Sequence, residues 1–219
     1  MTVTQNNKVV LIGAGYVGLA YAYAILNQGL VDHLAIIDLD EEKVWAQVED
    51  LSHAIPFSGH HLDVVVGTYE DCRDAALVVN CAGVATPGKL VGRDGPLSAE
   101  VLSRVLAINA VGTVSMMAQA AAAMKAQEPL GEDRGVIVNT ASVAAYDGQI
   151  GQIAYSASKG AVVALTLPAA RELASSQIRV VTIAPGLMET PMMAGLPEAA
   201  REALSTKTPH PARLGRPED

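Results

Sequence analysis

Residues 11–29 read LIGAGYVGLAYAYAILNQG, an apolar strand end that runs into a glycine-rich turn and then into a helical pattern. Gly13, Gly15 and Gly18 form the spacing GxGxxG directly between these two elements. The first glycine permits the tight turn, the second lets the backbone approach a pyrophosphate, and the third lets the helix pack closely on the strand. The free amides and the positive dipole at the helix start favour an anion. The stretch therefore predicts a dinucleotide-binding unit.

An acidic residue downstream supports this interpretation. Asp38 ends the next apolar run, twenty residues after Gly18, where a carboxylate can accept hydrogen bonds from both hydroxyls of an adenosine ribose. Asp40, Glu41 and Glu42 follow, so a 2′-phosphate would meet only negative charge, with no arginine nearby in the sequence. We therefore expect NAD, rather than NADP, as the cofactor. The alternative is a glycine turn that only eases packing.

Apolar runs alternate with helical patterns along the chain. Runs rich in Val and Ile, as expected of strands buried on both faces, cover 8–13, 34–38, 62–67, 76–83, 135–142 and 178–186. Helical stretches lie between most of them, which predicts an α/β fold of Rossmann type, a doubly wound parallel sheet in three αβα layers. Right-handed crossovers give the strand order 3-2-1-4-5-6, with ligands at the carboxyl ends of the strands.

Length and composition indicate one domain over residues 1–219, because no linker or charge block divides the chain before its polar tail at 206–219. A net charge of −8 without a basic cluster argues against nucleic acid or an anionic membrane as a partner. We find no apolar run approaching the roughly 18 to 20 uncharged residues of a membrane span. The start, MTVTQNNK, lacks the pattern of a secretory signal, so we expect a cytoplasmic location.

No metal site is expected. Cys72 and Cys81 lack metal-ligand spacing, and Cys81 falls inside a predicted strand as a buried, unreactive thiol. His60 and His61 are adjacent, so their side chains point apart on a regular element, and a solvated loop is favoured over a metal site.

Two predicted helices, 99–127 and 154–175, carry small or apolar residues around most of their circumference. A helix with one solvated face does not need that pattern. We expect the two helices to form the subunit interface of a homo-oligomer, a dimer or a tetramer. Pro168 should remove one backbone hydrogen bond from the second helix and kink it locally.

About residues 8–77 resemble the NAD-binding domain of the lactate and malate dehydrogenase family, in the segments KVVLIGAGYVG, AIIDLD, VEDLSHAIPF and GTYEDCRDA. The chemistry of that family requires a histidine base and arginines that bind a substrate carboxylate, on a second domain. No histidine occurs between His61 and His210, and His210 lies in the proline-flanked tail. A 2-hydroxyacid dehydrogenase is therefore the weaker hypothesis.

The second half carries different motifs. Tyr155 and Lys159, in AYSASKG, lie four residues apart on one helical face, so the ammonium can favour the ionised phenol. A lone YxxxK is common by chance and usually marks a surface pair. Here it is accompanied by NCAG at 80–83, by Asn109 in NAVG, by Ser142 at the end of the fifth predicted strand, and by PGLMET at 185–190.

This ordered set resembles the short-chain dehydrogenase/reductase family over about residues 78–219. The segments RGVIVNTASVAAYDGQIGQIAYSASKG and RVVTIAPGLMETPM are similar to the branch of short-chain 3-hydroxyacyl-CoA and type 10 17β-hydroxysteroid dehydrogenases. The resemblance implies that Tyr155 is the general acid/base, that Lys159 favours its ionised form and holds the nicotinamide ribose, that Ser142 orients the substrate oxygen, and that Asn109 supports a proton-relay water. It also implies cofactor contacts from Asn80, Ala82, Gly83, Pro185, Gly186 and Thr190.

Together the two resemblances predict a mosaic with its seam near 76–83. GAGYVG stands where short-chain dehydrogenases have TGxxxGxG, and the chain stops at RLGRPED, where that family continues into a helix and a last strand. We expect an NAD-dependent oxidoreductase that interconverts a secondary alcohol and a ketone, on a small-molecule substrate such as a 3-hydroxyacyl-CoA or a hydroxysteroid-like compound. The alternative is a recombinant or designed scaffold that binds NAD without turnover.

Overall fold

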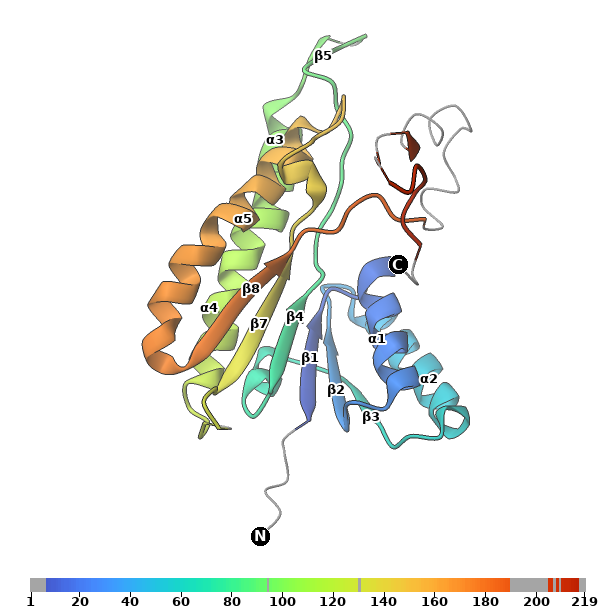
Figure 1. Cartoon of the computed structure of the whole chain (residues 1–219), viewed down its shortest axis with the longest axis vertical. Helices are drawn as coiled ribbons and strands as arrows, with labels where there is room; N and C mark the ends of the chain where they lie inside the picture. Colours follow the sequence, from blue (N-terminus) through green and yellow to red (C-terminus); the bar gives the residue numbers. More distant parts are fainter. Residues whose placement is uncertain are drawn as a thin grey trace.

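The computed structural model describes residues 7–93, 95–129, 131–189, 205, 206, 208 and 210–216. Its centre is a six-stranded parallel sheet of order β3-β2-β1-β4-β7-β8 (Figure 1). The strands are β1 Lys8–Ile12, β2 His33–Ile37, β3 Asp63–Val66, β4 Leu77–Asn80, β7 Gly135–Thr140 and β8 Ile178–Ile183. Because β7 and β8 are the fifth and sixth strands of this sheet, the predicted order is confirmed.

Helices cover both faces of the sheet, which gives the predicted three layers (Figure 1). On one face lie α1 (Tyr16–Gln28) and α2 (Glu41–Ser58); on the other lie α3 (Ala99–Leu106), α4 (Gly112–Met124) and α5 (Ile153–Leu173). Shorter turns are η1 (Tyr69–Cys72), η3 (Val143–Ala145) and η4 (Ala174–Ser176). A small antiparallel hairpin of β5 (Val91–Gly92) and β6 (Gly95–Pro96) projects beyond the carboxyl ends of the strands.

The core is divided by the sheet because successive strand residues point to opposite faces. In β1, Val9 and Leu11 pack in the cluster formed with α1 and α2, whereas Val10 and Ile12 pack in the cluster that includes methionines of α4. The same alternation makes the middle of β1 almost fully buried. The apolar runs of the sequence are therefore explained by burial on both faces.

The strands end earlier than the apolar runs suggested. β4 stops at Asn80, so Cys81 lies one residue beyond the strand and is half-buried, which corrects its predicted place. The Asn80 side chain accepts the Ala82 amide at 3.2 Å, while the Cys81 amide still donates to the Ile12 carbonyl at 2.7 Å. Burial nevertheless raises the pKa of the Cys81 thiol and raises that of Cys72 to about 11, as expected of unreactive thiols.

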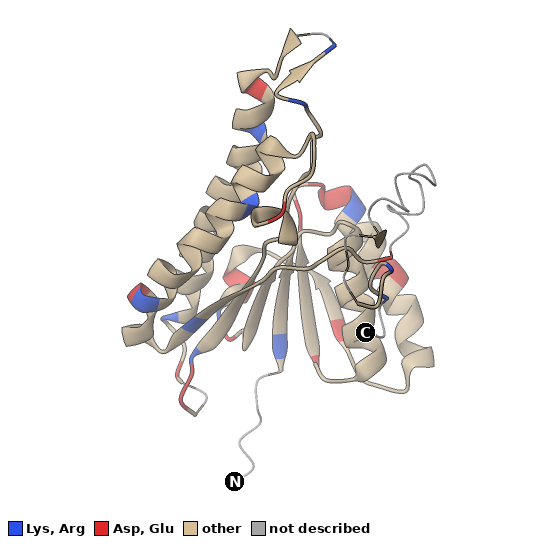
Figure 2. Cartoon of the chain, turned by 45° about the horizontal axis from the view of Figure 1, so that its top comes forward, with Lys and Arg blue, Asp and Glu red and all other residues tan. Residues whose placement is uncertain are grey.

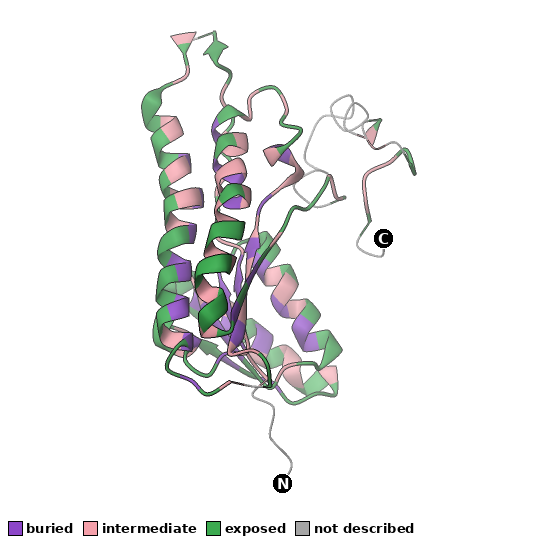
Figure 3. Ribbon diagram, turned by 60° about the vertical axis from the view of Figure 1, so that its left-hand side comes forward, coloured by how far each residue is buried: buried purple, intermediate pink, exposed green. Residues whose placement is uncertain are grey.

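The predicted helix at 99–127 contains an unpredicted irregularity. Between α3 and α4 the backbone forms a π-helical turn, η2 (Ala107–Val111). The helix predicted at 154–175 extends through Pro168 as α5 to Leu173 and continues into η4. The expectation that no segment approaches the length of a membrane span is wrong: Ala99–Met124 and Ile153–Ser176 are each long and apolar enough to cross a membrane. Core helices of soluble proteins meet the same criterion, so the two helices do not by themselves indicate a membrane span. Here both pack beside the sheet (Figure 3).

Part of the tail pairs with the segment after β8 through an isolated bridge between Met188 and Gly215. The Gly215 amide donates to the Leu187 carbonyl, and the Glu189 amide donates to the Gly215 carbonyl, at 2.9 and 2.7 Å. The tail therefore pairs with the segment that follows β8, near the carboxyl ends of the strands.

Candidate active site

The glycine loop between β1 and α1 has the geometry that the sequence predicts. Gly13 has a φ of +97°, and a Cβ at this position would lie 2.4 Å from the Ala82 nitrogen. A Cβ on Gly18 would lie 1.9 Å from the Gly13 oxygen, so the helix packs directly on the turn. By contrast, a Cβ on Gly15 would meet no atom within 4 Å. The loop is thus closed toward the protein and open at Gly15, as a phosphate cradle requires.

The start of α1 suits an anion. Gly15 is the N-cap and offers no side chain to the first amides, and the first turn holds no acidic residue. These amides and the helix dipole therefore favour a negatively charged group at this point.

Asp38 lies at the end of β2, beside this loop. Its Oδ2 accepts the Ala14 amide at 2.6 Å, while Gln47 Nε2 donates to the Ala14 carbonyl at 3.0 Å. The carboxylate is half-buried and can accept further hydrogen bonds, because an ionised carboxylate has about four acceptor positions. The residues present therefore fit a dinucleotide: amides for its pyrophosphate and a carboxylate for a ribose.

A buried polar network connects the end of β4 with η2. Asn80 Nδ2 donates to the Thr113 hydroxyl at 3.0 Å, and this hydroxyl donates to the Asn109 carbonyl at 2.7 Å. The Asn109 side chain in turn binds both the amide and the carbonyl of Val84, at 2.8 and 2.9 Å. Asn80 and Asn109 are both buried. They hold the loop after β4 in place, next to the glycine turn.

Lys159 projects from α5 into the same region. Its Nζ lies 3.5 Å from the Cβ position of Gly83 and donates to the Thr140 carbonyl at 2.6 Å. The side chain is 5 % exposed, and this burial lowers the pKa of Lys159 below its ordinary value. Nζ is also 5.7 Å from the centroid of the Tyr155 ring, so the structure brings this predicted pair together with Gly83 and Asn109.

Ser142, Pro185 and Gly186 also follow the carboxyl ends of strands, after β7 and β8. Ser142 follows β7 as the N-cap of η3, where its hydroxyl accepts the Ala144 amide at 3.1 Å. The Pro185 carbonyl accepts the Val143 amide at 2.9 Å, so the segment after β8 joins this turn, and Gly186 follows it with open space around its Cβ position. Thr190 lies outside the described residues.

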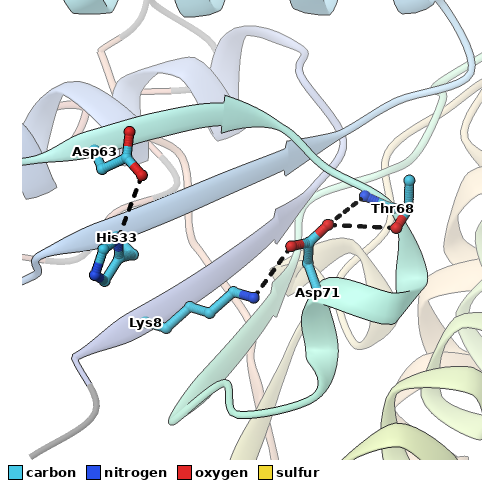
Figure 4. A network of polar contacts seen from close by, with 5 residues as sticks. All are labelled: Lys8, His33, Asp63, Thr68 and Asp71. Carbon is cyan, nitrogen blue, oxygen red and sulfur yellow. Dashed lines mark hydrogen bonds and ion pairs between the residues drawn. The ribbon is translucent and has the colours of Figure 1, made fainter.

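A cavity of about 530 Å³ lies away from these residues, at the amino ends of the strands. Its lining includes the first residues of β1, β2 and β3, together with Asp71 of η1. Figure 4 shows the polar contacts of these side chains. Lys8 Nζ binds Asp71 at 3.1 Å, and His33 lies 3.4 Å from Asp63. Although burial opposes it, hydrogen bonds from Thr68 and the Lys8 ammonium hold the pKa of Asp71 below its ordinary value. These contacts join the strands and η1 at the end of the sheet opposite the candidate site.

Charge is unevenly spread over the molecule (Figure 2). Within the described residues, α4 contains no charged side chain, and α5 contains only Lys159, Arg171 and Glu172.

The predicted histidine pair, His60 and His61, lies exposed in the loop after α2. The described residues contain no group of three or more His, Cys, Asp or Glu side chains that could hold a metal.

A model of the short chain dehydrogenase family matches residues 7–201. The chain belongs to this family. The match begins at residue 7 and so includes the glycine loop, whereas the sequence motifs indicated the family only from about residue 78. The short-chain dehydrogenase relatives include the 3-hydroxyacyl-CoA dehydrogenase type-2 of Drosophila melanogaster, 44 % identical over 98 % of this chain and 88 % of the relative. The crystal structure of 3-hydroxyacyl-CoA dehydrogenase type-2 from Mycobacterium avium superposes on this structure with a TM-score of 0.78. The two chains are 31 % identical, and the match covers 98 % of this chain and 87 % of that one.

The predicted resemblance of the amino-terminal part to lactate dehydrogenases is also confirmed. The L-lactate dehydrogenase of Corynebacterium jeikeium is 66 % identical to 87 residues of this chain, which are 39 % of this chain and 27 % of that enzyme. This short-chain dehydrogenase is therefore a mosaic of short-chain dehydrogenase and lactate dehydrogenase-like parts, and the family is one of oxidoreductases. Family membership implies a nicotinamide cofactor and a small-molecule substrate.

Sequence reasoning missed two hydroxyls of the site. Ser158 Oγ accepts from Asn109 Nδ2 at 2.9 Å, and Thr113 connects Asn80 to Asn109, but the sequence motifs predict a role for neither residue. Ser158 lies inside the segment AYSASKG, directly before Lys159, but a serine there has no local pattern that predicts its partner Asn109. Thr113 on α4 likewise has no local pattern that predicts its contacts.

Proposed function

We propose that this chain is an NAD(H)-dependent dehydrogenase that interconverts a secondary alcohol and a ketone on a 3-hydroxyacyl thioester or a hydroxysteroid-like compound. The single observation that carries the proposal is the placement of the Lys159 ammonium: it is buried beside Gly83 and lies 5.7 Å from the Tyr155 ring. The ammonium and the phenol are therefore close enough to act on one substrate and one cofactor, as proton transfer beside a nicotinamide ribose requires.

The proposed division of labour follows from the elements that carry each group. Tyr155, on the first turn of α5, would protonate the carbonyl oxygen during ketone reduction and take the proton back during alcohol oxidation. Ser142, at the end of β7, would donate a hydrogen bond to the same oxygen. When bound, the nicotinamide would supply or accept the hydride. Lys159 would hold its ribose, since Nζ retains two donors besides the one given to Thr140.

NAD is proposed over NADP because of the charge around the ribose position. Asp38 is fixed by the Ala14 amide, and Asp40, Glu41 and Glu42 follow it at the start of α2. A 2′-phosphate placed beside Asp38 would be repelled by that carboxylate.

A scaffold that binds NAD without turnover is the second candidate, and the mosaic composition favours it. Gly13, in the lactate dehydrogenase-like part, lies against Ala82, beside the seam between the two parts. A fold with an intact cofactor site does not ensure a competent substrate pocket. Both candidates predict cofactor binding, so only turnover separates them.

Two steps test the proposal. NADH is first titrated into the protein by following its fluorescence, and the protein is then assayed with 3-oxoacyl thioesters, ketosteroids and simple ketones. We expect micromolar NADH binding and turnover of at least one of the first two classes. Binding without turnover in the whole set would favour the scaffold.

We also propose that the protein is a homodimer through α4 and α5. Val114 on α4 and Leu167 on α5 are 49 % and 55 % exposed, and the outer faces of both helices are uncovered (Figure 3). Exposed apolar faces of this kind mark interfaces, and the scarcity of charge on both helices supports the assignment.

A further inference from the structure

We propose that Ser158 is a positioning residue, whose buried hydroxyl ties the first turn of α5, and with it Tyr155, to the π-helical turn that carries Asn109. The inference rests on the proposed function, because Tyr155 is the acid/base group of that function.

The Ser158 hydroxyl uses both of its hydrogen-bonding capacities. It accepts from Asn109 Nδ2 at 2.9 Å and donates to the Tyr155 carbonyl at 2.7 Å, and the residue is fully buried. A hydroxyl has one proton to donate, so the two contacts are compatible. Because Asn109 belongs to η2 and Tyr155 to α5, this one oxygen connects two separate helical segments.

The Asn109 end of this contact is held firmly. Both Nδ2 protons are used, one on Ser158 and one on the Val84 carbonyl, and Oδ1 accepts the Val84 amide. The Asn109 carbonyl accepts the Thr113 hydroxyl, which itself accepts from Asn80. Moving the Asn109 side chain would therefore break several buried hydrogen bonds at once, so it can serve as a fixed reference for α5.

The Tyr155 end needs such support. Tyr155 is the third residue of α5, and in the described chain the N-cap residue Gln152 makes no side-chain cap. The first turn of a helix without a cap has unpaired amides and frays more readily. Lys159 anchors the following turn through its contact with the Thr140 carbonyl, and Ser158 anchors the turn that holds Tyr155. A small tilt of this turn would displace the phenol, which acts only at hydrogen-bond distance from its substrate oxygen.

The test compares the parent with Ser158→Ala, a change that removes the hydroxyl and leaves the volume almost unchanged. We expect kcat to fall about tenfold, while the KM for the ketone and the Kd for NADH stay within about twofold. We also expect faster amide hydrogen exchange in peptides covering residues 153–162, because the turn is released from Asn109.

Thr166→Val is the matched control. The substitution removes a hydroxyl from the same helix. Like the Ser158 hydroxyl, this hydroxyl donates to a backbone carbonyl, that of Val162, and it also contacts the Thr182 hydroxyl. Its position is two turns beyond Ser158, so it should lower thermal stability without changing kcat or the exchange of residues 153–162.

An equal loss of kcat in both variants, or unchanged kcat and exchange in Ser158→Ala, would overturn the proposal. Failure of the proposed function would look different: the parent itself would reduce no ketone. The exchange measurement needs no turnover, so unchanged exchange in Ser158→Ala would overturn the positioning role in that case too, and faster exchange would support it.

Discussion

The Nζ atom of Lys159 lies 2.6 Å from the carbonyl oxygen of Thr140, the last residue of β7. This contact joins the helix that carries Tyr155 to the central sheet. The buried ammonium therefore has a hydrogen-bond acceptor, but the described hydrogen bonds and ion pairs give it no carboxylate partner. Because no such partner favours the charged form, the loss of solvation on burial lowers the pKa of Lys159.

The lowered pKa predicts a pH dependence. A lysine whose pKa is lowered loses its charge at a lower pH than an ordinary lysine, so kcat/KM for alcohol oxidation should fall at alkaline pH, before the ordinary lysine value of 10.5 is reached. Lys159→Arg keeps the charge at every accessible pH and should abolish this falling limb, although its overall rate will be lower. A falling limb that persists unchanged in the arginine variant would assign it to another group.

Asp38→Asn should reduce the preference for NADH over NADPH. The amide oxygen can still accept the Ala14 amide, so the loop is retained, but the charge that disfavours a 2′-phosphate is gone. We expect NADH affinity to fall about tenfold, the scale of a hydrogen bond to a charged group, and NADPH affinity to rise. Asp63→Asn removes the same charge at the other end of the sheet and is the control. Equal affinity for both cofactors in the parent would contradict the proposal.

Sedimentation of the parent at micromolar concentration should show a dimer. Leu167→Glu places a charge on the exposed face of α5 and should yield monomers that bind NADH normally. Phe57→Glu is the matched control, because Phe57 is 90 % exposed on α2, on the opposite face of the sheet. A monomeric parent, or dissociation by both variants alike, would rule out the interface through α4 and α5.

The parts of this fold that follow from local patterns were predictable. Alternating apolar runs and helices located the strands, the handedness rule for crossovers then predicted their order, and the spacing of Gly13, Gly15 and Gly18 predicted the loop beside Asp38. These features depend on short-range periodicity and on the geometry of one turn.

The site network was not predictable in the same way. Asn80 meets Thr113 across 33 positions of sequence, and Asn109 meets Ser158 across 49. Such contacts depend on how helices pack on the sheet, and a buried serine or threonine has no local signature. The π-helical turn at Ala107–Val111 likewise contains no glycine or proline that would predict it from the sequence. The catalytic roles of Asn109, Ser142, Tyr155 and Lys159 and the cofactor contacts stay predictions.

Turnover by Tyr155→Phe tests the central claim most directly. The substitution removes one oxygen from a half-buried side chain, so NADH binding and thermal stability should remain close to those of the parent. If Tyr155 is the general acid/base, ketone reduction should fall about a hundredfold or more, the usual scale for the loss of such a group. A Tyr155→Phe variant that reduces ketones at the rate of the parent would contradict the account.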